Sequence, residues 1–416
     1  MADFADEVRR LMAERGLSLR GLAKAAHYDA SLLSKVLNGH KPYTPYLAAS
    51  LDRALGAGGR IENAARQQPP QRPRPGRVPR RPSRAVEALQ AVMADDAVEL
   101  DIASDGLTEL VSHYATVLSV APSAAVYDDL LGVRSFAGSL LGRGHAPPGQ
   151  RPDLIVAAGW LSSLLSVSAA DIGDHAAALV WCADTERRGR DAGFPELLGW
   201  AALTRALIAY YQGQPRQSAA VARRGQETAP LGTVARAKLA AQEMRSLAML
   251  GDAAGMAEAR RRAVVAVGKI APGVATTGVY SIPRADDPPY TATSLLLVKR
   301  YQDAVETTRR LIETGYGPQS RTAGDQPTNY ARTLLILALA EAGLGRLDEA
   351  SAAGSTALAC GRLVWPTMVL AGRLDRSLAR SYPQAAGTAG YHARYVDAAD
   401  RMAQPARRPR PPEEPA

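Results

Sequence analysis

Near the start of the chain, apolar residues recur every three or four positions, which is the spacing of helices that bury one face. The first such stretch carries Phe4, Val8, Leu11 and Met12. Three further segments show the same pattern: residues 19–26, residues 30–37, and a stretch that opens at Pro45 and contains Leu47, Leu51 and Leu55. Residues suited to capping a helix N-terminus precede all three, namely Ser18, Asp29 and Thr44. Residues 1–60 are therefore predicted to form a compact domain of four or five short helices.

From residue 85 to residue 403 the pattern is that of longer helices joined by glycine-containing turns. The clearest unit runs from Tyr330 to Leu358, where Ala350 and Ala357 lie seven residues apart and Gly345 marks the turn. This unit is similar to a tetratricopeptide repeat (TPR), in which small residues let two antiparallel helices approach closely. Comparable turns are Gly173-Asp174, Gly213-Gln214, Gly251-Asp252 and Arg300-Tyr301. We expect an all-α fold with a TPR-like solenoid of helical hairpins; an irregular helical bundle is the alternative.

Two segments have a composition that does not support a packed core. Residues 61–84 are rich in Arg and Pro and are predicted to be a basic linker between the two domains. Residues 404–416 are similar in composition and are predicted to be a disordered tail. The linker either acts as a soluble spacer or adds contacts to a nucleic-acid backbone or minor groove.

The excess positive charge of the chain is confined to its N-terminal part. The formal net charge is +9, and residues 1–84 hold 16 basic and 7 acidic side chains, whereas residues 85–416 hold equal numbers of both. A basic N-terminal module joined to a neutral one indicates that the first module meets a polyanion.

The run SLRGLAKAAHYDASLLSKVLNGHKP (residues 18–42) resembles the helix-turn-helix of Xre-type regulators, the phage-repressor/Cro family, and in particular an actinobacterial subgroup. The matching positions are Leu22-Ala23, Asp29, Leu33-Ser34, Val36 and Asn38-Gly39. The resemblance implies a bacterial transcription regulator that binds double-stranded DNA. The alternative is a small helical domain whose polar face is only solvated or binds a protein.

In the family that this domain resembles, the third helix lies in the major groove and its N-terminal half faces the base edges. The expected base contacts are then the residues on the side of that helix away from its apolar face: Ala30, Ser31, Ser34 and Lys35. The expected phosphate contacts flank the second and third helices: Ser18, Arg20, Asn38, His40 and Lys41.

A solenoid of helical hairpins is expected to offer a concave face for a peptide, a protein, a sister subunit or a small-molecule signal. Candidate residues for that face are Trp200, Tyr211, Asn329 and Tyr330, together with Trp160 and Tyr210. Packing into the helical core is the alternative for each of them. The long connection at residues 272–290 is either a lid or hinge, or a tolerated insertion.

The sequence offers no pattern of residues for catalysis. It contains no Gly-rich phosphate loop, no paired histidines at metal-ligand spacing and only two cysteines, Cys182 and Cys360, which are expected to be buried. We therefore expect no enzyme, no cofactor and no metal. The N-terminal sequence lacks the pattern of a signal peptide, and the uncharged stretch at residues 154–170 is short for a membrane span. A cytoplasmic, nucleoid-associated protein without a membrane partner is expected.

These observations predict a sequence-specific DNA-binding transcription regulator that acts as a homodimer. Its TPR-like domain would dimerise, sense a signal, or do both. The alternative is a TPR-type interaction scaffold, similar to an antitoxin, whose DNA contact is secondary.

Overall fold

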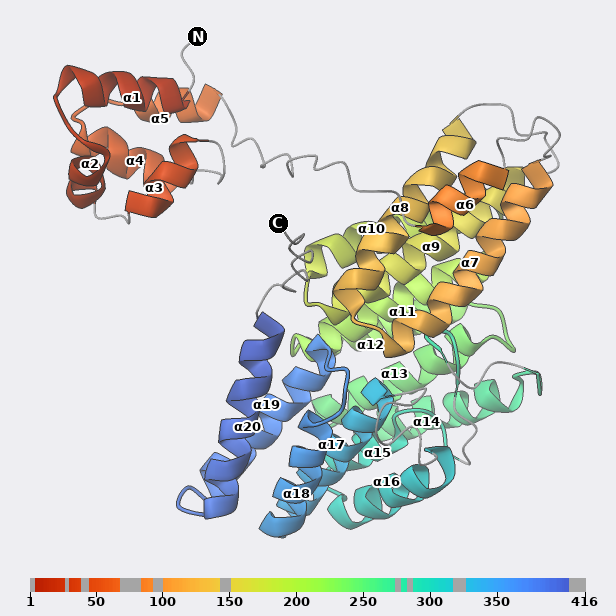
Figure 1. Ribbon diagram of the computed structural model, residues 1–416. Helices are drawn as coiled ribbons and strands as arrows, with labels where there is room; N and C mark the ends of the chain where they lie inside the picture. The colour runs from red at the N-terminus through yellow and green to blue at the C-terminus, as the bar shows by residue number, and fades with distance from the viewer. Residues whose placement is uncertain are drawn as a thin grey trace, which may run out of the picture. The chain divides into compact units, whose positions relative to one another are not determined.

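The computed structural model describes residues 4–26, 30–38, 45–67, 84–92, 100–142, 151–273, 278–282, 287–316 and 327–403 (Figure 1). The chain divides into two compact units, Met1–Arg81 and Pro82–Ala416. Every regular element in the described ranges is a helix, so the predicted all-α fold class is confirmed. The predicted tail at residues 404–416 lies outside the described residues.

The first unit contains five helices within its described residues: α1 (Phe4–Glu14), α2 (Leu19–Ala25), α3 (Ala30–Leu37), α4 (Pro45–Ala54) and α5 (Arg60–Gln67). The predicted apolar positions of the first four form one core, in which Leu11, Leu33 and Leu51 are fully buried. Ser18 caps α2 as predicted, because its Oγ accepts a hydrogen bond from the backbone N–H of Gly21 at 3.1 Å. The predicted caps at positions 29 and 44 lie outside the described residues.

The first unit continues beyond the predicted boundary at residue 60. Ile61 on α5 is fully buried in the same core, which stabilises the unit by about 1.5–3 kcal/mol. The buried Asp52 fixes the start of α5, since its carboxylate accepts hydrogen bonds from the N–H groups of Gly59 at 2.7 Å and Ile61 at 2.9 Å. A single large apolar residue in a polar, Arg-rich context carries no periodic signal, which is why the predicted linker includes residues 61–67. Residues 68–83 of that linker lie outside the described residues.

The second unit consists of longer helices that follow one another as hairpins (Figure 1). They are α6 (Arg84–Val92), α7 (Leu100–Val120), α8 (Ser123–Gly142), α9 (Arg151–Asp171), α10 (His175–Asp191), α11 (Pro195–Tyr211), α12 (Pro215–Thr228), α13 (Val234–Leu250), α14 (Ala253–Gly268), α15 (Thr291–Leu297), α16 (Tyr301–Gly315), α17 (Pro327–Gly343), α18 (Leu347–Leu358), α19 (Trp365–Ser381) and α20 (Ala386–Ala403). From α7 onward, each odd-numbered helix packs against the next helix, and successive hairpins pack against each other. This arrangement confirms the predicted solenoid-like array of helical hairpins.

The turns between these helices lie where the sequence placed them. All five predicted turns join the two helices of one hairpin, from α9–α10 to α17–α18. Gly345 has φ 80, a left-handed conformation that disfavours side chains with a Cβ. At the least regular turn, before α16, this conformation is adopted by Lys299 with φ 62, which explains why no glycine marks it.

The last hairpins of the second unit return to its first helices. α17 contacts α7, and α19 contacts α9. Arg362, between α18 and α19, is buried and joins these parts of the chain. Its guanidinium donates to the carbonyl oxygen of Ala121 at 2.8 Å, to Ser123 Oγ at 2.5 Å, to Thr328 Oγ1 at 2.7 Å and to Asp171 Oδ2 at 2.6 Å. The concave side of the array is therefore closed by contacts between residues that are far apart in sequence.

Within the described ranges, α9 is the one helix that is long and apolar enough to cross a membrane by length and composition. At 21 residues it is longer than the uncharged stretch at 154–170, because it also includes Arg151, Asp153 and Asp171. However, 67% of its apolar window is buried in the second unit, where α7, α8, α10 and α11 pack around it. This is the environment of a core helix in a helical domain.

Candidate nucleic-acid interface and candidate ligand cavity

In the first unit, α3 is held by contacts to α1 and α2. Leu33, Val36 and Leu37 are buried on its inner side. From α1, Arg9 Nη2 donates to the carbonyl oxygen of Leu37 at 2.5 Å and to Asn38 Oδ1 at 3.0 Å. A cation at the C-terminus of a helix satisfies its last carbonyl groups and interacts favourably with the helix dipole. Arg9 thus fixes the orientation of α3, a role that the sequence reasoning missed.

The residues predicted to contact bases all belong to α3, but the structure describes only some of their side chains. Ala30 is partly buried against the core of the unit. Ser34 is half-buried, and its Oγ accepts a hydrogen bond from Asn38 Nδ2 at 3.4 Å. The side chains of Ser31 and Lys35 lie outside the described part of the chain.

Three of the residues predicted to contact phosphates are described, and all three are exposed. Ser18 and Arg20 lie at the N-terminus of α2, where backbone N–H groups favour an anion. The capping bond uses Ser18 Oγ as an acceptor, so its hydroxyl hydrogen remains able to donate. Asn38, in contrast, already bonds Arg9 and Ser34, which gives it a structural role at the end of α3. His40 and Lys41 lie outside the described residues.

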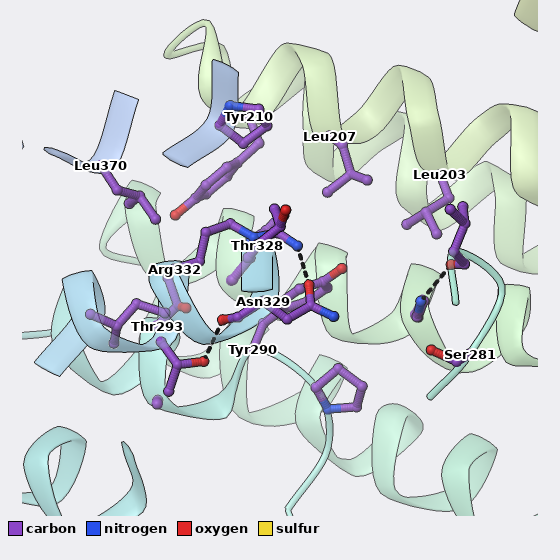
Figure 2. Close-up of a pocket in the computed structure, with 18 of the residues that line it drawn as sticks. Leu203, Leu207, Tyr210, Ser281, Tyr290, Thr293, Thr328, Asn329, Arg332 and Leu370 are labelled. Carbon is purple, nitrogen blue, oxygen red and sulfur yellow. Dashed lines mark hydrogen bonds between the residues drawn. The ribbon is translucent and has the colours of Figure 1, made fainter. Parts of the chain in front are cut away.

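The second unit contains a cavity of about 410 Å³, and Figure 2 shows part of its lining. Its walls come from α7, α9, α11, α13, α15, α16, α17 and α19 and from parts of the connection before α15. That connection is anchored, because the N–H of Val279 donates to the carbonyl oxygen of Ala115 at 3.0 Å. The ring of Tyr280 packs between Trp160 and Trp200, with both centroid distances at 4.7 Å. The described parts of this connection therefore form a fixed part of the wall.

The structure brings together most of the residues proposed for a ligand face. Trp200 and Tyr211 from α11 and Asn329 from α17 all line the cavity. Tyr330 points elsewhere: it is buried in the core, with its ring centroid 5.5 Å from that of Tyr316. Of the two further candidates, Tyr210 lines the cavity, whereas Trp160 packs behind it against Tyr280.

The sequence reasoning missed three cations that line this cavity: Lys238 and Arg245 on α13 and Arg332 on α17. Arg245 is buried and stacks on aromatic rings, with its Cζ 4.1 Å from the centroid of Tyr210 and 3.9 Å from that of Tyr290. Lys238 Nζ lies 5.3 Å from the centroid of Trp200. On α17, Arg332 donates to Asn329 Oδ1 (Figure 2).

A signal for these residues was present in the sequence of α13. Lys238, Gln242 and Arg245 are spaced i, i+4 and i+7, so they lie on one face of the helix. The neighbouring residues on that helix are mostly apolar or small. A polar stripe on an otherwise apolar helix indicates either a buried network or a binding surface.

The cavity has a strongly positive electrostatic environment. Burial acts to raise the pKa of the Tyr211 hydroxyl, but the charges of Arg245 and Arg332 outweigh this effect and lower it. Burial, together with repulsion from Arg332, lowers the pKa of Lys238 to about 7. The Lys238 side chain is half-buried, and it lines the cavity. Lys238, Arg245 and Arg332 thus line one cavity, and Arg332 acts on both Lys238 and Tyr211.

The structure describes both cysteines and part of the histidines and carboxylates of the chain. Burial raises the pKa of Cys182 to about 11, so the thiol stays protonated at neutral pH. Cys360 is buried as well, which confirms the expectation for both. Over the described residues, no group of three His, Cys, Asp or Glu side chains is arranged to hold a metal ion.

Residues 3–65 match a family model described as a helix-turn-helix domain. This match covers the five helices of the first unit almost completely. Searches of curated proteins and of solved structures gave no match. The match and the packing of α2 against α3 define the first unit as a helix-turn-helix domain, which supports a DNA-binding regulator as the class of this protein.

Proposed function

We propose that this chain is a sequence-specific transcription regulator of the Xre type, with α3 inserted in the major groove of double-stranded DNA. The observation that carries the proposal is the match of residues 3–65 to a helix-turn-helix domain, together with the fixed position of α3 on α1 and α2. The net charge of +9, all of it within residues 1–84, adds the electrostatic attraction that such binding requires.

In this proposal the outer side of α3 reads bases through Ala30, Ser31, Ser34 and Lys35. The flanking residues Ser18, Arg20, Asn38, His40 and Lys41 hold the phosphates on either side. The packing of Ala30 limits it to an apolar contact such as a thymine methyl group. The hydrogen bonds of Asn38 to Arg9 and Ser34 would hold its side chain at the end of α3, where it meets the phosphate.

The second unit would join two chains into a homodimer and respond to a signal. One small helix-turn-helix domain contacts few phosphates, so tight binding needs two domains on half-sites about 34 Å apart. A ligand or partner that prefers one arrangement of the second unit would then change the spacing of the two DNA readers. The proposal places the protein in the bacterial cytoplasm at the nucleoid and assigns it no catalytic activity.

The test is selection from random duplex DNA by the full chain, followed by a salt titration on the selected site. We expect a palindromic sequence and a slope of log K against log[salt] of about −0.9 per neutralised phosphate. Weak binding that ignores sequence would instead favour the interaction scaffold.

Three lysine variants separate the expected roles. Lys35→Ala should relax the preference at one base position, costing about 1–3 kcal/mol on the selected site. Lys41→Ala should weaken all sequences alike and reduce the salt slope by about one phosphate. Lys269→Ala, an exposed lysine of the second unit, serves as the control and should leave both unchanged. Identical behaviour of the first two variants would contradict the proposed orientation of α3.

A further inference from the structure

The charges that line the cavity of the second unit fall into two groups. Arg362 is fully paired, with Asp171 as its carboxylate partner at 2.6 Å. Asp287, at another part of the wall, pairs with Arg260 at 2.8 Å and with Arg310. The remaining cations, Lys238, Arg245 and Arg332, form no ion pair with a carboxylate in the described parts of the chain.

Arg245 is the most buried of these three cations, with only 2% of its surface exposed. Its guanidinium is fixed by stacking on the rings of Tyr210 and Tyr290 and by a hydrogen bond from Nε to Gln242 Oε1 at 2.6 Å. Its Nη2 is buried and has no hydrogen-bond partner among the residues that the structure describes. A buried guanidinium nitrogen without an acceptor is costly, so within the described residues Arg245 offers a fixed donor that a ligand oxygen can use.

Apolar side chains form one part of the wall, and hydroxyl groups such as those of Thr293 and Thr328 line another part. Leu203 and Leu207 on α11 and Leu370 on α19 line the same cavity (Figure 2). Ile336 on α17 lines it as well. Its volume of about 410 Å³ lies at the lower end of the usual range for small-molecule sites. Apolar walls with a few convergent polar groups are typical of such sites.

We propose that this cavity binds a small organic acid, with its carboxylate on Arg245 and Arg332 and its apolar body on the leucine and isoleucine side chains. The planar guanidinium groups offer paired N–H donors that match the two oxygens of a carboxylate. Tyr211, whose hydroxyl is influenced by both arginines, lies beside the bound carboxylate. Lys238 supplies a third positive charge near Trp200.

This binding site specifies the chemical class of the signal in the proposed function. The inference rests on that function only where it concerns the effect of the ligand on DNA binding. The residues proposed to hold the acid lie on α11 and α13, in the middle of the hairpin array, and on α17 and α19, near its end. A bound acid would therefore contact helices that are far apart in sequence. Such a ligand shifts the equilibrium between two conformations of the second unit by the difference between its affinities for them.

The experiment titrates the full chain, without DNA, with two acids and their neutral amides: octanoate with octanamide, and indole-3-acetate with indole-3-acetamide. A third pair, N-acetyl-dileucine and its C-terminal amide, distinguishes a free organic acid from the carboxyl end of a peptide. Binding is measured by calorimetry and by tryptophan fluorescence, since Trp200 and Trp365 line the cavity. We expect at least one acid to bind about ten- to a hundredfold more tightly than its amide.

Variants link this preference to the proposed residues. Arg245→Met and Arg332→Gln should each weaken binding of that acid at least about tenfold and remove the preference over the amide. Arg373→Gln is the matched control: Arg373 also lies near the ring of Tyr210, at 5.8 Å, but does not line the cavity. Its affinity for the acid should stay within about twofold of the parent. Circular dichroism checks that each variant is folded. If Arg245→Met does not fold, Arg332→Gln provides the test.

The proposal is overturned if none of the acids binds, if acid and amide bind equally, or if Arg373→Gln loses as much affinity as the cavity variants. Because no DNA is present, these outcomes are independent of sequence-specific DNA binding. A chain that binds the acid and ignores DNA sequence would refute the proposed function alone.

Discussion

The Arg362 cluster offers the sharpest test of how the second unit is held together. Arg362→Met keeps the length and apolar stem of the side chain but removes four hydrogen bonds and an ion pair. These bonds join the α7–α8 turn, the end of α9 and the start of α17. The Asp171 carboxylate, 17% exposed, then retains only its longer bond from Ser123 at 3.3 Å.

The expected magnitude follows from the burial of the pair. Breaking a buried ion pair by removing one partner costs about 3–5 kcal/mol, because the other charge is left uncompensated. Since Asp171 keeps some contact with water, we expect the lower end, about 3 kcal/mol in the free energy of unfolding. The double variant Arg362→Met/Asp171→Asn removes both charges, and its loss should be smaller than the sum of the single losses by about 2 kcal/mol.

The assay is urea unfolding followed by tryptophan fluorescence. All four tryptophans (Trp160, Trp181, Trp200 and Trp365) belong to the second unit, so the signal reports on that unit alone. The control is Arg401→Met, which breaks an exposed ion pair with Asp397 on α20 and should change the free energy by less than about 0.5 kcal/mol. A loss of less than about 1 kcal/mol for Arg362→Met, or additive single and double variants, would refute the argument that this cluster closes the array.

Three other changes test individual contacts. Asp52→Ala removes the acceptors at the start of α5 and should destabilise that helix by about 1–2 kcal/mol, seen as faster hydrogen exchange in α5; unchanged exchange would refute the capping role. Lys238→Met should raise the urea midpoint at pH 7 by removing a confined charge. The free energy of unfolding of the parent should also rise as the pH increases above about 7. The reason is that the pKa of Lys238 is about 7 in the folded state against 10.5 for an ordinary lysine, so the unfolded chain binds more protons. The variant should not show this rise. Gly225→Ala would put a Cβ 2.7 Å from the Cβ of Ala202 and should cost about 1–3 kcal/mol, whereas Gly390→Ala on α20 meets nothing and should be neutral or stabilising; equal effects would contradict the close packing of α11 and α12.

The first unit could be predicted in detail because its information is local. Each of the first four helices is set by its own apolar spacing, and the Ser18 cap is visible in the sequence. The exception is α5, whose only large buried residue is Ile61. Its capping partner, Asp52, lies on the preceding helix, so it is recognised only once the two helices are packed together.

The second unit could be predicted as an array of hairpins, but its cavity could not. The glycine turns are local signals, whereas the cavity brings together α11, α13 and α17, which are separated by many residues. The prediction of Trp200, Tyr211 and Tyr330 rests on their aromatic rings, and that of Asn329 also on its place at the start of a repeat helix; of these four, Tyr330 faces the core. Residue type does not tell which side of a helix faces the concave surface.

The three cations relate stability to ligand binding in this unit. Lys238, Arg245 and Arg332 lack carboxylate partners within the described residues, and the charge of Arg332 repels that of Lys238, so this arrangement reduces the stability of the fold. Apolar residues of similar size would pack the same space with less cost. A local arrangement that conflicts with stability is expected where the chain has another function to perform. If Lys238→Met increases the free energy of unfolding while Arg245→Met no longer binds the acid, the residues that favour stability and those that favour binding differ on one face of α13.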